Sequence, residues 1–118
     1  MTLGEISDEI SQAVTKFEKN IMGRGPEKIN TIIFEDLIII RLEGFFSVAE
    51  QRLARNGEVE QVKKLRTLLF ENEVDNLIAL IEDITEIGIK SIHSDVSTRT
   101  GEKVIIVSLK ENLESKIN

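Results

Sequence analysis

Residues 28–42, KINTIIFEDLIIIRL, decide the fold of this 118-residue chain. Residues 28–34 place apolar side chains on both faces of an extended chain, and residues 37–40 are continuously apolar and rich in β-branched side chains. The polar pair Glu35-Asp36 separates them and suits a tight turn. The stretch therefore predicts a β-hairpin, and its second strand is of the kind that is usually covered on both faces.

The chain before this hairpin predicts an amphipathic helix from Thr2 to Met22. Its apolar residues recur at helical intervals and fall at Ile6, Ile10, Ala13, Val14, Phe17 and Ile21. Thr2 and Glu5 match a capping box, in which each side chain accepts a hydrogen bond from a free backbone N–H. Gly23 is a predicted left-handed cap, and Pro26 prevents further helical turns.

The chain after the hairpin predicts two helices and a second strand pair. A capping box from Ser47 to Glu50 opens a short helix that ends near Asn56. A helix over residues 58–86 follows, about 40 Å long if unbroken, and its apolar spacing slips near residues 71–73, where we expect a bend or a change of packing face. Strands are expected at 89–98 and 103–109. The last segment, 110–118, is a polar tail expected to fray.

The order helix, strand, strand, helix, helix, strand, strand predicts an α+β fold in one domain over residues 1–118. The two hairpins most simply form one four-stranded antiparallel sheet with the helices packed on it. The second and fourth strands are apolar on both faces, so either helices cover both sides or a second copy covers the open side. We expect the second arrangement, a homodimer.

The composition argues against several classes of protein. The chain has no cysteine and one histidine, which removes disulfides, thiolate nucleophiles and the usual zinc sites. Its net charge of −6 argues against direct nucleic-acid binding, which normally needs a basic face. No apolar run approaches the roughly 20 residues of a membrane-spanning helix, and no signal peptide is visible. We expect a cytoplasmic protein without membrane insertion, metal or cofactor.

Two arginines in turns are candidate ligand contacts. Gly23-Arg24-Gly25-Pro26 stands where the first helix ends, and Arg24 between two glycines would expose its guanidinium. Thr98-Arg99-Thr100-Gly101-Glu102-Lys103 forms the tip of the second hairpin. If the two loops meet, they frame an anion site made by Arg24, Gly25, Arg99, Thr100 and Lys103. The alternative is that both segments are ordinary turns.

His93 and Asp95 are the candidates for acid–base chemistry. They share one face of the third strand with two serines and Arg99. Alternate strand residues are about 6.5–7 Å apart, too rigid a spacing for a catalytic triad, and no nucleophile elbow is present. A polar, solvent-facing strand edge is the simpler interpretation. The alternative is a small enzyme that acts on an anionic metabolite near the arginines.

An ordered set of segments resembles the MpsC family, small bacterial proteins named for association with a sodium-translocating, membrane-potential-generating system. The set follows the N-terminal helix and comprises residues 23–26 (GRGP), 36–44 (DLIIIRLEG), 49–53 (AEQRL), 62–66 (VKKLR) and 93–102 (HSDVSTRTGE). The resemblance spans roughly residues 5–110. It implies an accessory or regulatory role near an ion-transport system and supplies no catalytic residues.

We therefore expect a non-enzymatic binding, regulatory or accessory protein that is linked to a membrane ion-transport system. The loops at 23–26 and 98–103 would contact an anion or an acidic partner. The expected partners are a second copy and a protein at the transport system. Two alternatives stay open: a small enzyme that uses His93 and Asp95, and a structural assembly subunit.

Overall fold

A computed structural model describes residues 1–44 and 46–117 of the chain. The predicted order of elements is confirmed, with one short helix added at the end. The elements are α1 (Leu3–Met22), β1 (Lys28–Phe34), β2 (Leu37–Glu43), α2 (Val48–Arg55), α3 (Val59–Thr85), β3 (Ile89–Ser97), β4 (Glu102–Leu109) and α4 (Leu113–Ile117). Both predicted capping boxes, at Thr2 and Ser47, are present, and Gly23 caps α1 at φ 81°.

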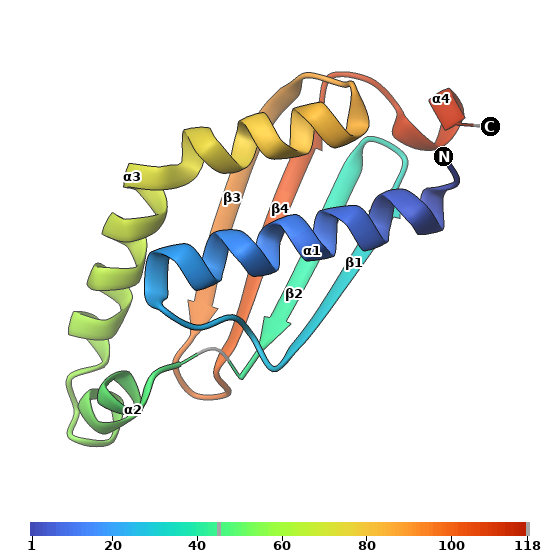
Figure 1. Cartoon of the computed structure of the whole chain (residues 1–118). Helices are drawn as coiled ribbons and strands as arrows, with labels where there is room; N and C mark the ends of the chain where they lie inside the picture. The colour runs from blue at the N-terminus through green and yellow to red at the C-terminus, as the bar shows by residue number, and fades with distance from the viewer. Residues whose placement is uncertain (45, 118) are drawn as a thin grey trace.

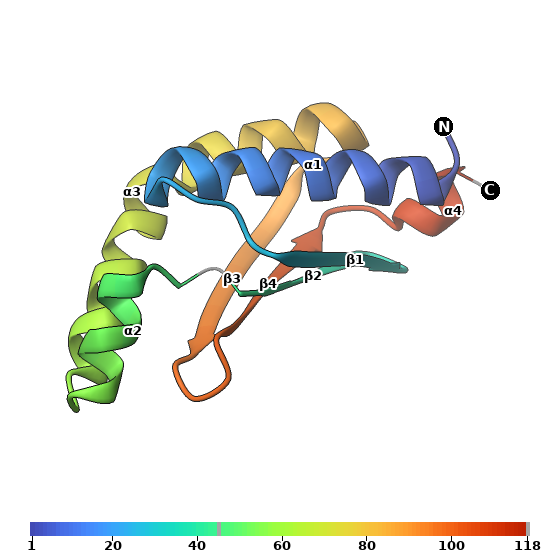
Figure 2. The ribbon, with the colours of Figure 1, turned by 60° about the horizontal axis from the view of Figure 1, so that its bottom comes forward.

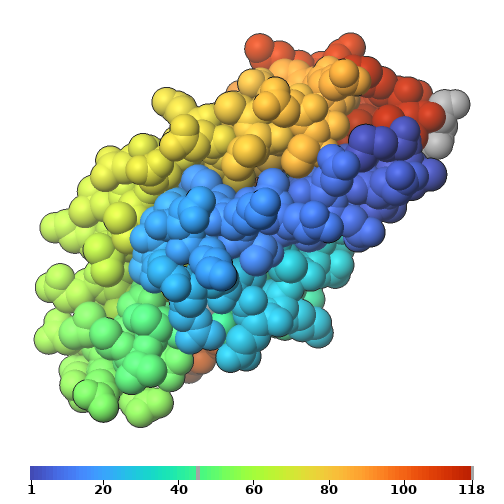
Figure 3. Space-filling model, viewed as in Figure 1, coloured from blue at the N-terminus to red at the C-terminus, as the bar shows by residue number. Residues whose placement is uncertain are grey.

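The four strands form one antiparallel sheet in the order β1-β2-β4-β3, so the two predicted hairpins pair through β2 and β4 (Figure 1). Helices α1 and α3 lie side by side across one face of this sheet, and α2 stands beyond its end (Figures 1 and 3). Figure 2 shows the layers edge-on, with the long helices on one side only. The α+β class and the sheet are therefore as predicted.

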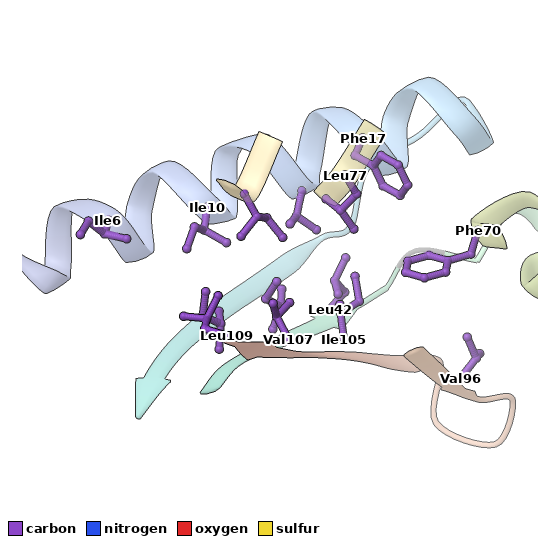
Figure 4. Packing of buried hydrophobic residues seen from close by; sticks show 14 of the residues in the cluster. Ile6, Ile10, Phe17, Leu42, Phe70, Leu77, Val96, Ile105, Val107 and Leu109 are labelled. Carbon is purple, nitrogen blue, oxygen red and sulfur yellow. The ribbon is translucent and has the colours of Figure 1, made fainter. Parts of the chain in front are cut away.

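The core lies between the helices and the covered face of the sheet. Ile6, Ile10 and Phe17 of α1 point toward the apolar residues of β2 and β4 (Figure 4). The rings of Phe17 and Phe70 meet edge to face, with centroids 6.1 Å apart, and join α1 to α3. Apolar burial of this extent is the main source of stability for a domain of this size.

The other face of the sheet has no helix over it in the described part of the chain (Figure 2). On β2 and β4 the buried residues alternate with partly exposed ones, and Ile106 is 38% exposed. The alternative in which the helices of one chain cover both sides of the sheet is therefore wrong for the described part of the chain. The reason is topological: α1, which precedes the first hairpin, and α3, which connects the two hairpins, lie on the same face of the sheet.

The long helix α3 is one continuous element of 27 residues. Its axis bends in the middle, so that one half packs beside α2 and the other beside α1 (Figure 1). The bend explains the slip in apolar spacing, because the buried side of the helix changes where its neighbour changes. Glu86, at φ 57°, ends the helix in the left-handed conformation.

The C-terminal segment corrects a prediction. Residues 110–118 are predicted to fray because they are mostly polar, but Leu113 is fully buried in the core and opens α4. This correction concerns residues 110–117, since position 118 lies outside the described residues. The Leu113 backbone N–H donates to the carbonyl of Glu35 at 3.0 Å, and the Glu114 carboxylate accepts from the Glu35 N–H at 2.9 Å. One apolar side chain and two hydrogen bonds thus fasten this segment to the β1–β2 turn.

Two buried ion pairs lie where α1, α2, α3 and β4 meet. The Arg66 guanidinium donates to both carboxylate oxygens of Glu50, at 2.6 and 2.7 Å, and Lys103 Nζ donates to Glu18 at 2.7 Å. All four side chains are less than 5% exposed. The cations also sit over aromatic rings, Arg66 at 5.3 Å from the Phe46 centroid and Lys103 at 4.7 Å from that of Phe70. Such pairing is what allows charges to stay in an apolar interior.

Burial and pairing act on these groups in opposite directions. For Glu50, burial raises the pKa, but hydrogen bonds from Arg66 and the Ser47 backbone outweigh it and hold the pKa below its ordinary value of 4.5. For Lys103, burial lowers the pKa, and the Glu18 carboxylate offsets this only in part. Glu50 therefore stays ionised in the folded protein near neutral pH.

We expect Leu113→Ala to lower the free energy of unfolding by about 2–5 kcal/mol, because the truncation leaves a cavity in the core. Leu68→Ala is the matched control, since Leu68 is 54% exposed, and its effect should stay within about 0.5 kcal/mol. Urea unfolding followed by circular dichroism measures both values. A Leu113→Ala protein as stable as the control would contradict the burial of this segment.

We expect Glu50→Gln to lower the free energy of unfolding by about 3 kcal/mol near pH 7, because Arg66 is left buried without its carboxylate. The pKa of Glu50 is depressed in the folded state, so its contribution is complete above pH 4.5 and is lost as the pH falls through the folded value. The difference from wild type should therefore shrink on acidification.

Urea unfolding at a series of pH values between 7 and 3 tests this dependence. Glu71→Gln is the control, because Glu71 is exposed and makes no ion pair in the described part of the chain. A difference between wild type and Glu50→Gln that stays constant down to pH 3 would contradict the role given to this ion pair.

Candidate functional site

A cavity of about 390 Å³ opens where the loop after α1, the link from β2 to α2 and the β3–β4 turn come together. These segments lie at the same end of the molecule, the lower end in Figure 1. The cavity is lined by Arg24, Glu27, Gly44, Phe46, Gln51, Ala54, Arg55, Thr98, Arg99, Thr100 and Gly101. The structure therefore brings together the two loops that the sequence singled out, although they are about 75 residues apart in the chain.

Arg24 is held in place by backbone carbonyls. Its Nη1 donates to the carbonyl of Phe46 and its Nη2 to that of Gly44, both at 2.9 Å, and Glu27 lies 3.6 Å from Nη2. The side chain is 38% exposed. The interpretation of Arg24 as an open guanidinium between two glycines is therefore wrong. It fastens the link between β2 and α2 and presents only part of its donors to the cavity.

Arg99 and Thr100 reach the cavity from the turn between β3 and β4. The turn closes because Gly101 adopts φ 72°, a left-handed conformation that favours glycine. The Thr100 N–H donates to Ser97 Oγ at 3.3 Å, which orders the turn. Arg99 is exposed and makes no ion pair within residues 1–44 and 46–117, so its guanidinium is available to a ligand.

Arg55 is a lining residue that the sequence analysis missed. It lies in the last turn of α2, four residues after Gln51, so that both side chains face the cavity. Arg52, in the same helical turn, does not line it. The helical spacing along α2 gives Arg55 and Arg52 different directions. Which of the two faces the cavity depends on how α2 is oriented relative to the hairpin, and the sequence does not give this orientation.

The cavity is positively charged on a protein of net charge −6. Its lining has three arginines and one glutamate, together with two threonine hydroxyls. Guanidinium groups bind carboxylates and phosphates through paired N–H donors. The described residues contain no group of three histidine, cysteine or acidic side chains that could hold a metal ion. The arrangement therefore favours an anion over a cation.

Two other predicted contacts lie elsewhere. Lys103 is buried in its ion pair with Glu18 and does not line the cavity, because the pleat of β4 turns it toward the helices. Gly25 packs against α1: a Cβ built on it would lie 3.2 Å from the Thr15 methyl group. Nearness in sequence to the two loops does not bring these residues to the cavity, and successive side chains of a strand point to opposite faces of the sheet, which turns Lys103 away.

His93 and Asp95 pair with residues of the helix-free face, and neither shares the cavity with Arg24, Arg55 and Arg99. His93 pairs with Ile106 and Asp95 with Val104 across the β3–β4 ladder. The imidazole Nε2 is 3.2 Å from Ser91 Oγ, and the Asp95 carboxylate accepts from the N–H of Val96 at 2.9 Å. Neither residue lines the arginine-rich cavity.

Comparison with known proteins agrees with the resemblance noted in the sequence. The family described as "Na+-translocating membrane potential-generating system (MpsC)" matches residues 2–111. The chain is 36% identical over 115 residues to "Uncharacterized protein YbcI" of Bacillus subtilis (strain 168), which covers 97% of this chain and 93% of that protein. It is 35% identical over 65 residues to "Uncharacterized protein YrhF" of the same organism, which covers 54% of this chain and 53% of that protein.

No solved structure matches the chain. None of the helices in the described residues has the length and apolar character needed to cross a membrane. The family match extends over nearly the whole chain and includes every segment that lines the cavity. The chain therefore belongs to the MpsC family.

Proposed function

We propose that this protein is a non-enzymatic binding or regulatory module that recognises an anionic group at the cavity lined by Arg24, Arg55 and Arg99. The anion belongs to a small multivalent ligand or to an acidic segment of a partner. The family description names a Na+-translocating membrane potential-generating system. This name supports the proposal that the protein acts beside such a system, from the cytoplasm, as an accessory protein.

The observation that carries the proposal is the contrast between two sets of cations. Arg66 and Lys103 are buried and neutralised by Glu50 and Glu18. Arg55 and Arg99, in contrast, face a common cavity without an ion pair among the described residues. Unpaired guanidiniums that converge on one cavity repel each other unless an anion lies between them. Binding an anion would relieve that repulsion, which favours recognition.

A catalytic role for His93 and Asp95 has weaker support. Both lie on an open sheet face, and neither has a lining arginine beside it. A substrate anion held at the cavity would therefore not meet the proposed acid–base groups. A purely structural subunit stays as the other alternative, and it predicts no ligand at the cavity. The homodimer is a separate proposal, because it rests on the helix-free face of the sheet.

We expect wild-type protein to bind pyrophosphate or citrate in a titration followed by calorimetry at low ionic strength, and the affinity to fall as salt is added. Arg55→Glu and Arg99→Glu should each weaken binding at least about tenfold, because a charge-assisted hydrogen bond is replaced by repulsion. Arg24 is left unchanged, since its contacts to the Gly44 and Phe46 carbonyls support the fold.

Arg52→Glu is the matched control, because Arg52 lies in the same helical turn as Arg55 but outside the cavity. It changes the net charge by the same amount and should leave the affinity near the wild-type value. Equal losses in Arg52→Glu and Arg55→Glu would show non-specific charge attraction and overturn the proposed site. Failure of wild type to bind either anion would overturn the small-ligand form of the proposal.

The partner form is tested by affinity capture from native cells with membranes included, using wild type, Arg55→Glu/Arg99→Glu and Arg52→Glu as baits. We expect a partner that is retained by wild type and Arg52→Glu and lost from the double variant. Unchanged capture by the double variant would exclude these arginines as the contact.

A further inference from the structure

The helix-free face of the sheet carries a continuous apolar area. One row across the four strands consists of Ile32, Ile39, Ile106 and His93, which pair in register from β1 to β3. Phe34 and Leu37 continue the area on one side of this row, and Val104 on the other. Ile32, Phe34 and Ile106 are 47%, 56% and 38% exposed. Figure 2 shows this face without a covering layer.

We infer that this face is where a second copy of the chain packs, sheet against sheet, to form a layered homodimer with the helices outside. A face of this kind needs a cover of equal shape, and two sheets can pack about 10 Å apart with interdigitating side chains. An isologous contact provides the same apolar area on both sides. The inference concerns residues outside the arginine-lined cavity and does not depend on it.

The charges on this face favour a second copy over a strongly charged partner. Lys28 and Glu43 lie 3.9 Å apart, and Arg41 and Glu102 lie 3.7 Å apart, each as an ion pair between neighbouring strands. Together with Asp95, these ion-paired residues amount to two cations and three anions. A face of nearly balanced charge can meet itself without repulsion, although the whole chain has a net charge of −6.

The area of the face agrees with a concentration-dependent dimer. Four strands about 4.8 Å apart and seven residues of about 3.3 Å each give a projected area of about 440 Å² per copy. Two copies would thus bury about 900 Å² in projection and more over their side chains, near the lower limit of about 1,000 Å² for a specific interface. Ile39 and Ile106 pair at the middle of the area, so a two-fold axis near them gives the largest overlap.

Sedimentation equilibrium over a series of protein concentrations tests the inference. We expect wild type to move from monomer to dimer mass as its concentration rises. Ile106→Glu places two carboxylates opposite each other near the axis and should weaken dimerisation at least about 30-fold. Leu68→Glu is the control, because Leu68 is exposed on α3 in the helix layer, and it should dimerise as wild type does.

Circular dichroism and thermal unfolding show whether each variant keeps the monomer fold. Should Ile106→Glu fail to fold, Ile106→Thr keeps the β-branched shape and should still weaken the dimer. A wild-type protein that stays monomeric at every concentration would overturn the inference and leave the face to another partner. A dimer unaffected by the Ile106 variants, or weakened as much by Leu68→Glu, would place the contact on another surface and overturn it as well.

Discussion

The pairing of buried charges at the junction of α1, α2, α3 and β4 is the constraint on which the rest of this structure depends. A guanidinium or ammonium group cannot remain in an apolar interior without an opposite charge in contact. Glu50 therefore fixes Arg66, and with it the position of α2 against α3, while Glu18 fixes Lys103 and thereby α1 against β4. Because α2 stands beyond the end of the sheet, its attachment decides whether Arg55 reaches the β3–β4 turn. The cavity is a consequence of this attachment.

Arginine side chains serve two purposes in this chain. Some stabilise the fold and others give the cavity its positive charge, and the surroundings of each side chain decide which. Arg66 lies over the ring of Phe46 and is neutralised by a carboxylate, so it contributes to the fold. Arg24 gives two hydrogen bonds to backbone carbonyls and links the end of α1 to the chain that leads into α2. Arg55 and Arg99 have no such partners in the described part of the chain and provide the positive charge of the cavity. A count of arginines could not have made this distinction.

The sheet poses a second physical problem, which this chain solves on one face only. The helices bury Ile38, Ile40, Ile105 and Val107 completely. Four of the alternate residues on the same strands are nevertheless apolar as well: Leu37, Ile39, Val104 and Ile106. Soluble antiparallel sheets usually present polar residues on an uncovered face. In this protein, apolar side chains on the uncovered face extend over the central strands β2 and β4 and onto β1. A single chain leaves these apolar side chains exposed, and a second copy packed against this face would cover them.

Local chemistry in the sequence predicted the elements well. Thr2 with Glu5 and Ser47 with Glu50 located two helix starts, Gly23 located a helix end, and Glu35-Asp36 located the first turn. These features depend on residues within one or two turns of each other. The burial of Leu113 and Lys103 could not be predicted in this way, because each depends on contacts with segments more than 70 residues away.

By itself the sequence determined the order of helices and strands, the pairing within each hairpin and the acidic character of the molecule, since all of these follow from neighbouring residues and composition. Only the tertiary structure decided which face of the sheet the helices cover, which cations are neutralised and that Arg55 joins Arg24 and Arg99 around one cavity. The physical reason is that burial and charge pairing depend on distances through space, and the chain sets those distances only when its separate elements pack together.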